Sequence, residues 1–111
     1  MSRRISALLA SLATVAAMLT LPALPAQAAT GSITGIGGKC VDVAGANSAN
    51  GTAVQLYDCN GTGAQQWTRP GDGTIRALGK CLDVNAGSVA DGAKVQLWTC
   101  NHGSNQQWTL G

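Results

Sequence analysis

The sequence predicts an all-β protein built from two tandem copies of one structural unit. Three observations predict this fold class: the second half of the chain repeats the first, apolar residues alternate with polar ones, and glycine is abundant. All 15 glycines lie after residue 30. Because each glycine in a helix interior costs about 1 kcal/mol, this region cannot be mainly helical. Short strands joined by glycine-rich turns fit the composition.

The repeat appears when the chain is compared with itself at an offset of 41 residues. Residues 38–68 then align with residues 79–109 without a gap, and 16 of the 31 aligned pairs are identical. A period near 40 residues is typical of architectures whose units bury their apolar faces against one another. We call residues 31–70 unit one and residues 72–111 unit two.

Each unit is expected to contain about four strands. In Val54–Tyr57 and its copy Val95–Trp98, valine and leucine alternate with glutamine and an aromatic residue, which is the pattern of a half-buried strand. Residues 81–84 alternate in the same way, so Cys81 and Asp83 are expected on the outer face of their strand. The other strands are expected at residues 33–36, 74–78 and 65–68, the last with its copy in unit two.

Four cysteines allow three disulfide pairings. Cys100 lies an even number of residues after Gln96 and is therefore expected on the same outer face. A bridge from Cys100 to Cys81 within unit two is then geometrically plausible. Repeat symmetry favours Cys40–Cys59 and Cys81–Cys100, because each unit then carries its own disulfide. A zinc site is the rival interpretation, but the chain has no Cys-x-x-Cys pair, and thiols oxidise in an exported protein.

Residues 1–28 are interpreted as a secretory signal peptide. Arg3 and Arg4 precede an apolar run, and the small residues Ala26-Gln27-Ala28 suggest cleavage before Ala29. An uncleaved membrane anchor is the alternative, although the run is barely long enough to span a bilayer. We therefore expect a secreted, extracellular protein that has no contact with the membrane after cleavage.

The mature chain is expected to be electrically neutral. Residues 29–111 contain five lysines and arginines and five aspartates, so the net charge of +2 comes from Arg3 and Arg4. A neutral chain has no electrostatic footprint for phosphate backbones or acidic membranes. Nucleic acid is therefore not an expected partner.

The order of motifs in each unit resembles the ricin B-type lectin repeat. The motifs are Gly-Lys-Cys-(Val/Leu)-Asp-Val, Val-Gln-Leu-(Tyr/Trp)-x-Cys-Asn and Gln-Gln-Trp, and they cover essentially the whole mature chain. Such repeats also occur in carbohydrate-binding modules of secreted glycoside hydrolases. The resemblance implies a β-trefoil, in which three units surround a pseudo-threefold axis. Two units imply a partial β-trefoil of eight strands.

The resemblance also implies a sugar pocket on the outer face of each unit. An aromatic ring there stacks on the C–H face of a pyranose, and a carboxylate accepts hydrogen bonds from two neighbouring hydroxyls. Unit one is expected to bind more weakly, because Ala64 replaces Asn105 and Tyr57 is a smaller platform than Trp98. The residues assigned are Asp83, Gln96, Trp98 and Asn105 in unit two, and Asp42, Gln55 and Tyr57 in unit one.

Several of these residue types have structural alternatives. Asp42 and Asp83 could cap turns, and Trp98 could belong to the core. Gln65 and Gln106 could bond either backbone or ligand. The resemblance implies that the tryptophans of the Gln-x-Trp motif, Trp67 and Trp108, pack in the core. The single histidine, His102, is expected to be a bystander in a loop.

A binding protein is predicted in preference to an enzyme. A glycosidase needs two carboxylates roughly 5–10 Å apart, whereas Asp42 and Asp83 are repeat equivalents on separate lobes. The chain has no glutamate, Ser-His-Asp set or cluster of metal ligands, so neither catalysis, a cofactor nor a metal is expected. The expected partner is carbohydrate. A protein-interaction or inhibitor trefoil, or a truncated remnant of a glycoside hydrolase's binding module, is the alternative.

Two units are expected to leave exposed the apolar face that a third would cover. A small domain has little stability to spare, so a homo-oligomer is predicted. Three chains supply six units, enough for two complete trefoils, and make a trimer the most economical closed form. A monomer with an open pair of lobes is the rival expectation.

Overall fold

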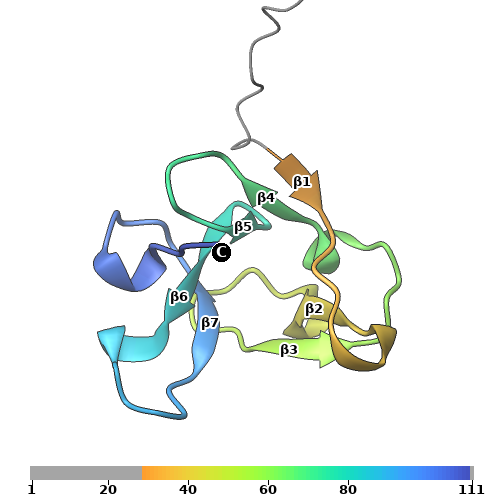
Figure 1. Ribbon diagram of the computed structural model, residues 1–111, viewed down its shortest axis with the longest axis horizontal. Coiled ribbons are helices and arrows are strands. Elements are labelled where there is room, and N and C mark those ends of the chain that lie inside the picture. The colour runs from red at the N-terminus through yellow and green to blue at the C-terminus, as the bar shows by residue number, and fades with distance from the viewer. Residues whose placement is uncertain (1–28, 111) are drawn as a thin grey trace, which may run out of the picture.

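The structure is a computed structural model that describes residues 29–110, which form seven short antiparallel strands and no α-helix (Figure 1). The expected all-β fold class is confirmed. The predicted signal peptide lies outside the described residues. No helix within residues 29–110 has the length and apolarity needed to cross a membrane. The strands are β1 (Ala29–Gly31), β2 (Cys40–Val43), β3 (Val54–Tyr57), β4 (Trp67–Arg69), β5 (Arg76–Ala77), β6 (Lys80–Val84) and β7 (Val95–Trp98).

Each unit contains one hairpin with the same register. In unit one, β2 pairs with β3 and places Asp42 opposite Gln55. In unit two, β6 pairs with β7 and places Asp83 opposite Gln96. Figure 1 shows the two hairpins beside each other, with β1, β4 and β5 above them. The β2–β3 hairpin forms its own sheet, and the other strands form one sheet in the order β1-β4-β5-β6-β7.

The strands that flank the hairpins differ from the prediction. Residues 33–36 do not form the leading strand; the chain pairs earlier, where β1 runs antiparallel to β4. The expected closing strand of unit two is not formed either. Of the residues there, Trp108 donates its backbone N–H to Gly73 O at 2.8 Å. Unit one thus has four strands and unit two has three, because the last segment lacks a neighbouring strand among residues 29–110.

The core lies between the hairpins and the central strands. It includes Val43, Trp67, Ile75, Leu82 and Leu97, with the partly buried Trp108 packed against it. The indole N–H of Trp67 donates to Val41 O at 2.9 Å, and that of Trp108 donates to Leu82 O at 3.1 Å. The two tryptophans therefore pack in the core, each tied to the hairpin of its own unit.

Each unit is closed by one disulfide, in the pairing that repeat symmetry favours. Cys40 is bonded to Cys59 and Cys81 to Cys100, each across a sequence separation of 19 residues. Cys40 and Cys81 are buried. Cys81 lies opposite Trp98 on the face of the β6–β7 hairpin turned away from Leu82 and Leu97, as parity predicted, but it is fully buried there.

Candidate functional site

Each unit carries one buried aspartate that is held by side-chain amides. In β6, Asp83 Oδ1 accepts a hydrogen bond from Gln96 Nε2 at 3.1 Å. Its Oδ2 accepts from Gln106 Nε2 at 2.8 Å and from Asn105 Nδ2 at 3.1 Å. Asp83 and Gln106 are both buried. Asp83 shares the strand face of Gln96, away from Leu82 and Leu97 in the core, as parity predicted, but it is not exposed, since three amides close over its carboxylate.

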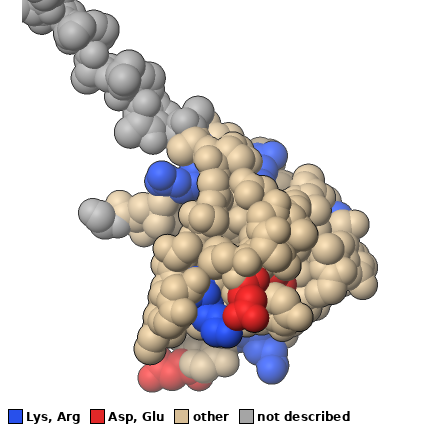
Figure 2. Space-filling model, turned by 90° about the vertical axis from the view of Figure 1, so that its right-hand side faces the viewer, with Lys and Arg blue, Asp and Glu red and all other residues tan. Residues whose placement is uncertain are grey.

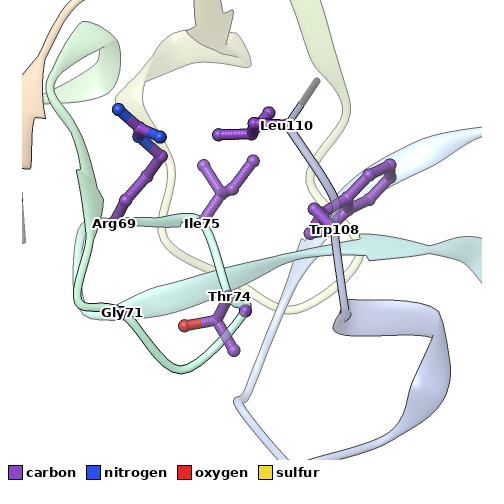
Figure 3. Close-up of a pocket in the computed structure, with 7 residues that line it drawn as sticks. Arg69, Gly71, Thr74, Ile75, Trp108 and Leu110 are labelled. Carbon is purple, nitrogen blue, oxygen red and sulfur yellow. The ribbon is translucent and has the colours of Figure 1, made fainter. Parts of the chain in front are cut away.

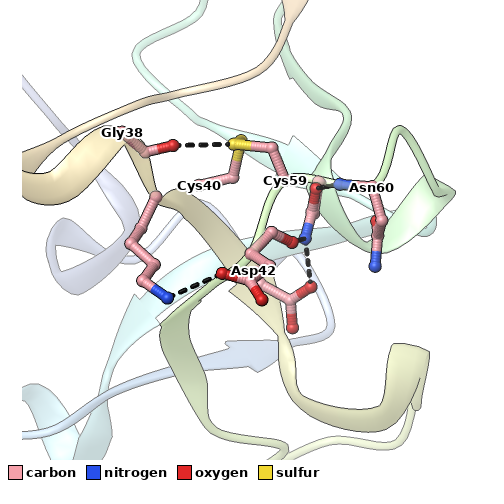
Figure 4. A network of polar contacts seen from close by, with 8 residues as sticks. Gly38, Cys40, Asp42, Cys59 and Asn60 are labelled. Atoms are coloured by element: carbon pink, nitrogen blue, oxygen red, sulfur yellow. Dashed lines mark hydrogen bonds and ion pairs between the residues drawn. A yellow bond between two sulfur atoms is a disulfide. The ribbon is translucent and has the colours of Figure 1, made fainter.

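Asp42 in β2 has the same arrangement with one donor fewer. It also shares a strand face with its partner Gln55 and is buried there rather than exposed. Gln65 Nε2 donates to Asp42 Oδ2 at 2.8 Å (Figure 4), and Gln55 Nε2 donates to Oδ1 at 3.1 Å. Ala64 supplies no donor at the position of Asn105. Because a carboxylate offers about four lone-pair sites, Asp42 retains more unused acceptor capacity than Asp83.

The sequence left open whether Gln65 and Gln106 bond the backbone or a ligand. In the structure both are buried and form hydrogen bonds within the protein. Besides Asp42, Gln65 Nε2 donates to Asp58 O at 2.9 Å, and Gln65 Oε1 accepts the backbone N–H of Asn60 at 2.8 Å. Gln106 makes the corresponding bonds to Thr99 and Asn101 in unit two. Each glutamine thereby ties the aspartate of its unit to the loop after the hairpin. Their role is to hold the carboxylate in place.

The two outward aromatic residues stand at the ends of β3 and β7. Tyr57 is 54% exposed and Trp98 is 39% exposed. Trp98 belongs to the surface, as its parity predicted, and its ring lies where a Cβ added at Gly51 of unit one would make van der Waals contact with it. Each ring shares a strand with the glutamine that bonds the buried aspartate, Gln55 or Gln96. A ring, a glutamine and a carboxylate therefore converge once in each unit.

A hollow of about 250 Å³ lies over this set in unit one. Ala64 leaves room that Asn105 fills in unit two, where the Asn105 amide also donates to Val84 O at 3.1 Å. Sequence reasoning identified Asp42, Gln55 and Tyr57 but missed the loop residues that complete the walls. The hollow is lined by Asp42, Gly45, Ala46, Gln55, Tyr57, Asn60, Thr62 and Ala64.

The turn after β2 forms one wall of this hollow. Gly45 has a φ of 62° and Ala46 a φ of 53°, both in the left-handed region. Ala86 and Gly87, with φ of 56° and 63°, repeat this pair after β6. The glycine in each pair, together with its placement three or four residues past the aspartate, is the signal by which these turns could have been found.

Charges on the described surface are few and mixed in sign. On the face shown in Figure 2, basic and acidic side chains lie in small groups. Lys39 Nζ lies 2.6 Å from Asp58 Oδ1, and this hydrogen bond and charge lower the pKa of the Asp58 carboxyl. Hydrogen bonds from Thr74, with a smaller effect of Arg76, lower the pKa of Asp72. Neither aspartate belongs to the hollow, so the site has no exposed charge of its own.

The described residues do not support metal binding or catalysis by a pair of carboxylates. Within residues 29–110, no three histidine, cysteine or acidic side chains are grouped so that they could hold a metal ion. His102 is exposed in a loop of unit two. Asp42 and Asp83 lie in separate amide networks, one in each unit, and do not form a catalytic pair.

Comparison with known proteins decides the family. The model of the ricin-type beta-trefoil lectin domain matches residues 29–111. The chain belongs to this family. The expected partial β-trefoil is thereby confirmed.

Relatives of this lectin domain include an enzyme and a protein solved with a bound sugar. A glucan endo-1,3-beta-glucosidase of Cellulosimicrobium cellulans is 55% identical over 40 residues, which are 36% of this chain and 7% of that enzyme. A non-toxic homologue of type II RIPs from Momordica charantia, solved in complex with α-methyl-D-galactoside, is 47% identical with a TM-score of 0.61. The match covers 67% of this chain and 28% of that one.

A designed three-fold symmetric protein, ThreeFoil, is also similar to the lectin domain. The two sequences are 39% identical, and the crystal structure of ThreeFoil matches with a TM-score of 0.57. The match covers 64% of this chain and 55% of the designed one. The chain spans less than two thirds of the length of each of these relatives.

Proposed function

We propose that this lectin domain binds hexopyranose sugars at the aromatic and polar rim above each buried aspartate, without catalysing their hydrolysis. The observation that carries the proposal is the duplicated convergence of a ring, a glutamine and a carboxylate, with a hollow of about 250 Å³ over the copy in unit one. The exposed ring offers a flat apolar surface for a pyranose face. Unused lone pairs of the carboxylate accept hydrogen bonds from sugar hydroxyls.

Binding at one such site is expected to be weak. The hollow is open, and a single ring gives little area to bury, so we expect a Kd of about 1 mM per site, equivalent to roughly 4 kcal/mol. Two sites on one domain strengthen binding only where sugars are clustered, as on a polysaccharide or a dense glycan. The domain is proposed to act outside the cell, where both disulfides persist.

Single substitutions of the two rings should separate the sites. We expect Trp98→Ala to remove more binding than Tyr57→Ala, because the indole offers the larger stacking surface. Titration of each variant with α-methyl-D-galactoside and with a soluble β-1,3-glucan, followed by NMR, measures the loss. Ile36→Ala, which shortens another exposed apolar side chain, is the control. Equal losses in both variants, or none in either, would contradict the site assignment.

A further inference from the structure

A loop of unit one extends a strand of unit two, in addition to the β4–β5 pairing that also joins the units. Gly51 N–H donates to Leu97 O at 2.8 Å, and Leu97 N–H donates to Thr52 O at 2.9 Å. Beside them, Asn50 Oδ1 accepts the backbone N–H of Thr99 at 2.8 Å, and Asn50 Nδ2 donates to the Thr99 hydroxyl at 3.0 Å. Residues 48–53 of unit one, the docking loop, thus cover the outer edge of β7 and leave Leu97 fully buried.

Both parts of this contact exist a second time without a counterpart in residues 29–110. Residues 89–94 are the copy of the docking loop in unit two, and Val89 in that loop is exposed. Strand β3 is the copy of β7, yet no loop of the described residues pairs with its outer edge. Its Leu56, the copy of the buried Leu97, is 49% exposed. Unit two therefore offers a free loop, and unit one offers a free strand edge.

The core residues show the same asymmetry. Ile33 and Ile75 are equivalent, because their carbonyls accept the N–H of Val41 and Leu82 at 2.8 Å in β2 and β6. Ile75 is 5% exposed, whereas Ile33 is 36% exposed. Trp67 is buried, whereas its copy Trp108 is only partly buried. Residues that are buried where the two units meet therefore have more exposed copies on the sides that face away from the neighbouring unit.

Ile33 and Trp108 border two hollows, and Arg69 lines both of them. One, of about 510 Å³, is lined by β1 and by Ile33, Ile75 and Leu110. The other, of about 190 Å³, lies between Ile75, Trp108 and Leu110 (Figure 3). Leu110 borders both, so they lie next to each other on one side of the core. Exposed apolar side chains grouped in this way, with polar residues beside them, are typical of a face that another element packs against.

We propose that this open face binds one further unit of the same kind, supplied by a second copy of this chain. The free loop 89–94 docks on β3 of the incoming unit, and the docking loop of that unit covers β3 and Leu56 of the first chain. The chain corresponds to 55% of a designed protein with three-fold symmetry, which agrees with room for one more unit.

The incoming copy contributes only one of its two units. If the two units of the incoming chain stayed together, its second unit would overlap with unit one of the first chain. The incoming chain must therefore open at its inter-unit connection, where Gly71 and Gly73 have left-handed φ values of 101° and 90°. Three chains then form two closed rings of three units, one chain being shared between the rings.

Charge distinguishes the proposed contact from the one inside the chain. The neutral pair Asn50 and Thr99 has the copies Asp91 and Asp58, so the new contact brings two carboxylates together near Lys39. Two carboxylates placed side by side repel each other and oppose association. The combined substitutions Asp91→Asn and Asp58→Thr recreate the pair that already joins the two units, and they should tighten association about tenfold.

Size exclusion with light scattering, over a range of concentrations of the full chain, tests the proposal. We expect the wild type to reach three times the mass of one chain, and the Asp91→Asn/Asp58→Thr variant to do so at lower concentration. Leu56→Asp should remain monomeric and folded, because Leu56 is not in the core of the chain itself. Circular dichroism and thermal unfolding verify that each variant folds.

Two outcomes would overturn the proposal. One is a wild type and a neutralised variant that both stay monomeric at every concentration. The other is an oligomer whose mass Leu56→Asp leaves unchanged, because its contact would then lie elsewhere on the molecule. The masses of the wild type and of the variants are measured without sugar, so these outcomes leave the proposed function to the glycan titration.

Discussion

Replacing Cys81 and Cys100 together with serine should lower the free energy of unfolding by about 3 kcal/mol. Each disulfide closes a loop with a sequence separation of 19 residues, and a cross-link over a loop of this length restricts the unfolded chain by about that amount. Replacing all four cysteines should leave no cooperative unfolding transition, because a domain of this size has only a few kcal/mol in total. Denaturant unfolding followed by tryptophan fluorescence measures both effects.

The matched control is the pair Cys40→Ser and Cys59→Ser in unit one. The sequence separation is the same, so a similar loss is expected. Peptide mapping without reductant should first show that each double variant keeps the other native disulfide. A four-serine protein that still unfolds in one sharp transition would show that packing alone holds the units.

Trp67→Ala should destabilise the chain by about 4 kcal/mol, in the range found for large-to-small substitutions in a core. Trp67 is buried among the core residues, and its indole N–H satisfies the carbonyl of Val41. Its loss leaves both a cavity and an unpaired carbonyl. Thermal and denaturant unfolding of the variant give the free-energy difference.

Trp108→Ala is the matched comparison, since Trp108 makes the same bond to Leu82 O in unit two. Because it is only partly buried in the described chain, its removal should cost clearly less than that of Trp67. If the two substitutions cost the same in a monomeric sample, the asymmetry between the open and closed sides of the core would be incorrect.

The sequence predicted the positions of the hairpin strands well because the alternation of apolar and polar residues is local. The residues that alternate, Val54–Tyr57 and Val95–Trp98, are those of β3 and β7. The repeat also predicted one disulfide within each unit, as the structure has it. The leading strand was misplaced because its position depends on the register with β4, where Thr30 lies opposite Thr68. That partner is distant in sequence and leaves no local pattern.

The burial of Asp42 and Asp83 could not be read from alternation. Parity assigns a side chain to one face of its strand but does not say what covers that face. Here the covering groups include Gln65 and Gln106, each 23 residues beyond its aspartate. Likewise, nothing in the alternation distinguishes Leu56 from Leu97, because their exposure depends on whether a loop of another unit lies over the strand.

Binding of the chain to a glycan array, compared with a Tyr57→Ala/Trp98→Ala double variant, tests most directly whether this lectin domain binds sugars at the assigned sites. Both rings are exposed, so the variant should fold as the wild type does. The wild type is expected to be retained on densely displayed glycans and the double variant to be lost from them. A wild type that binds no glycan, or a folded double variant that binds the same glycans equally well, would contradict the proposed function.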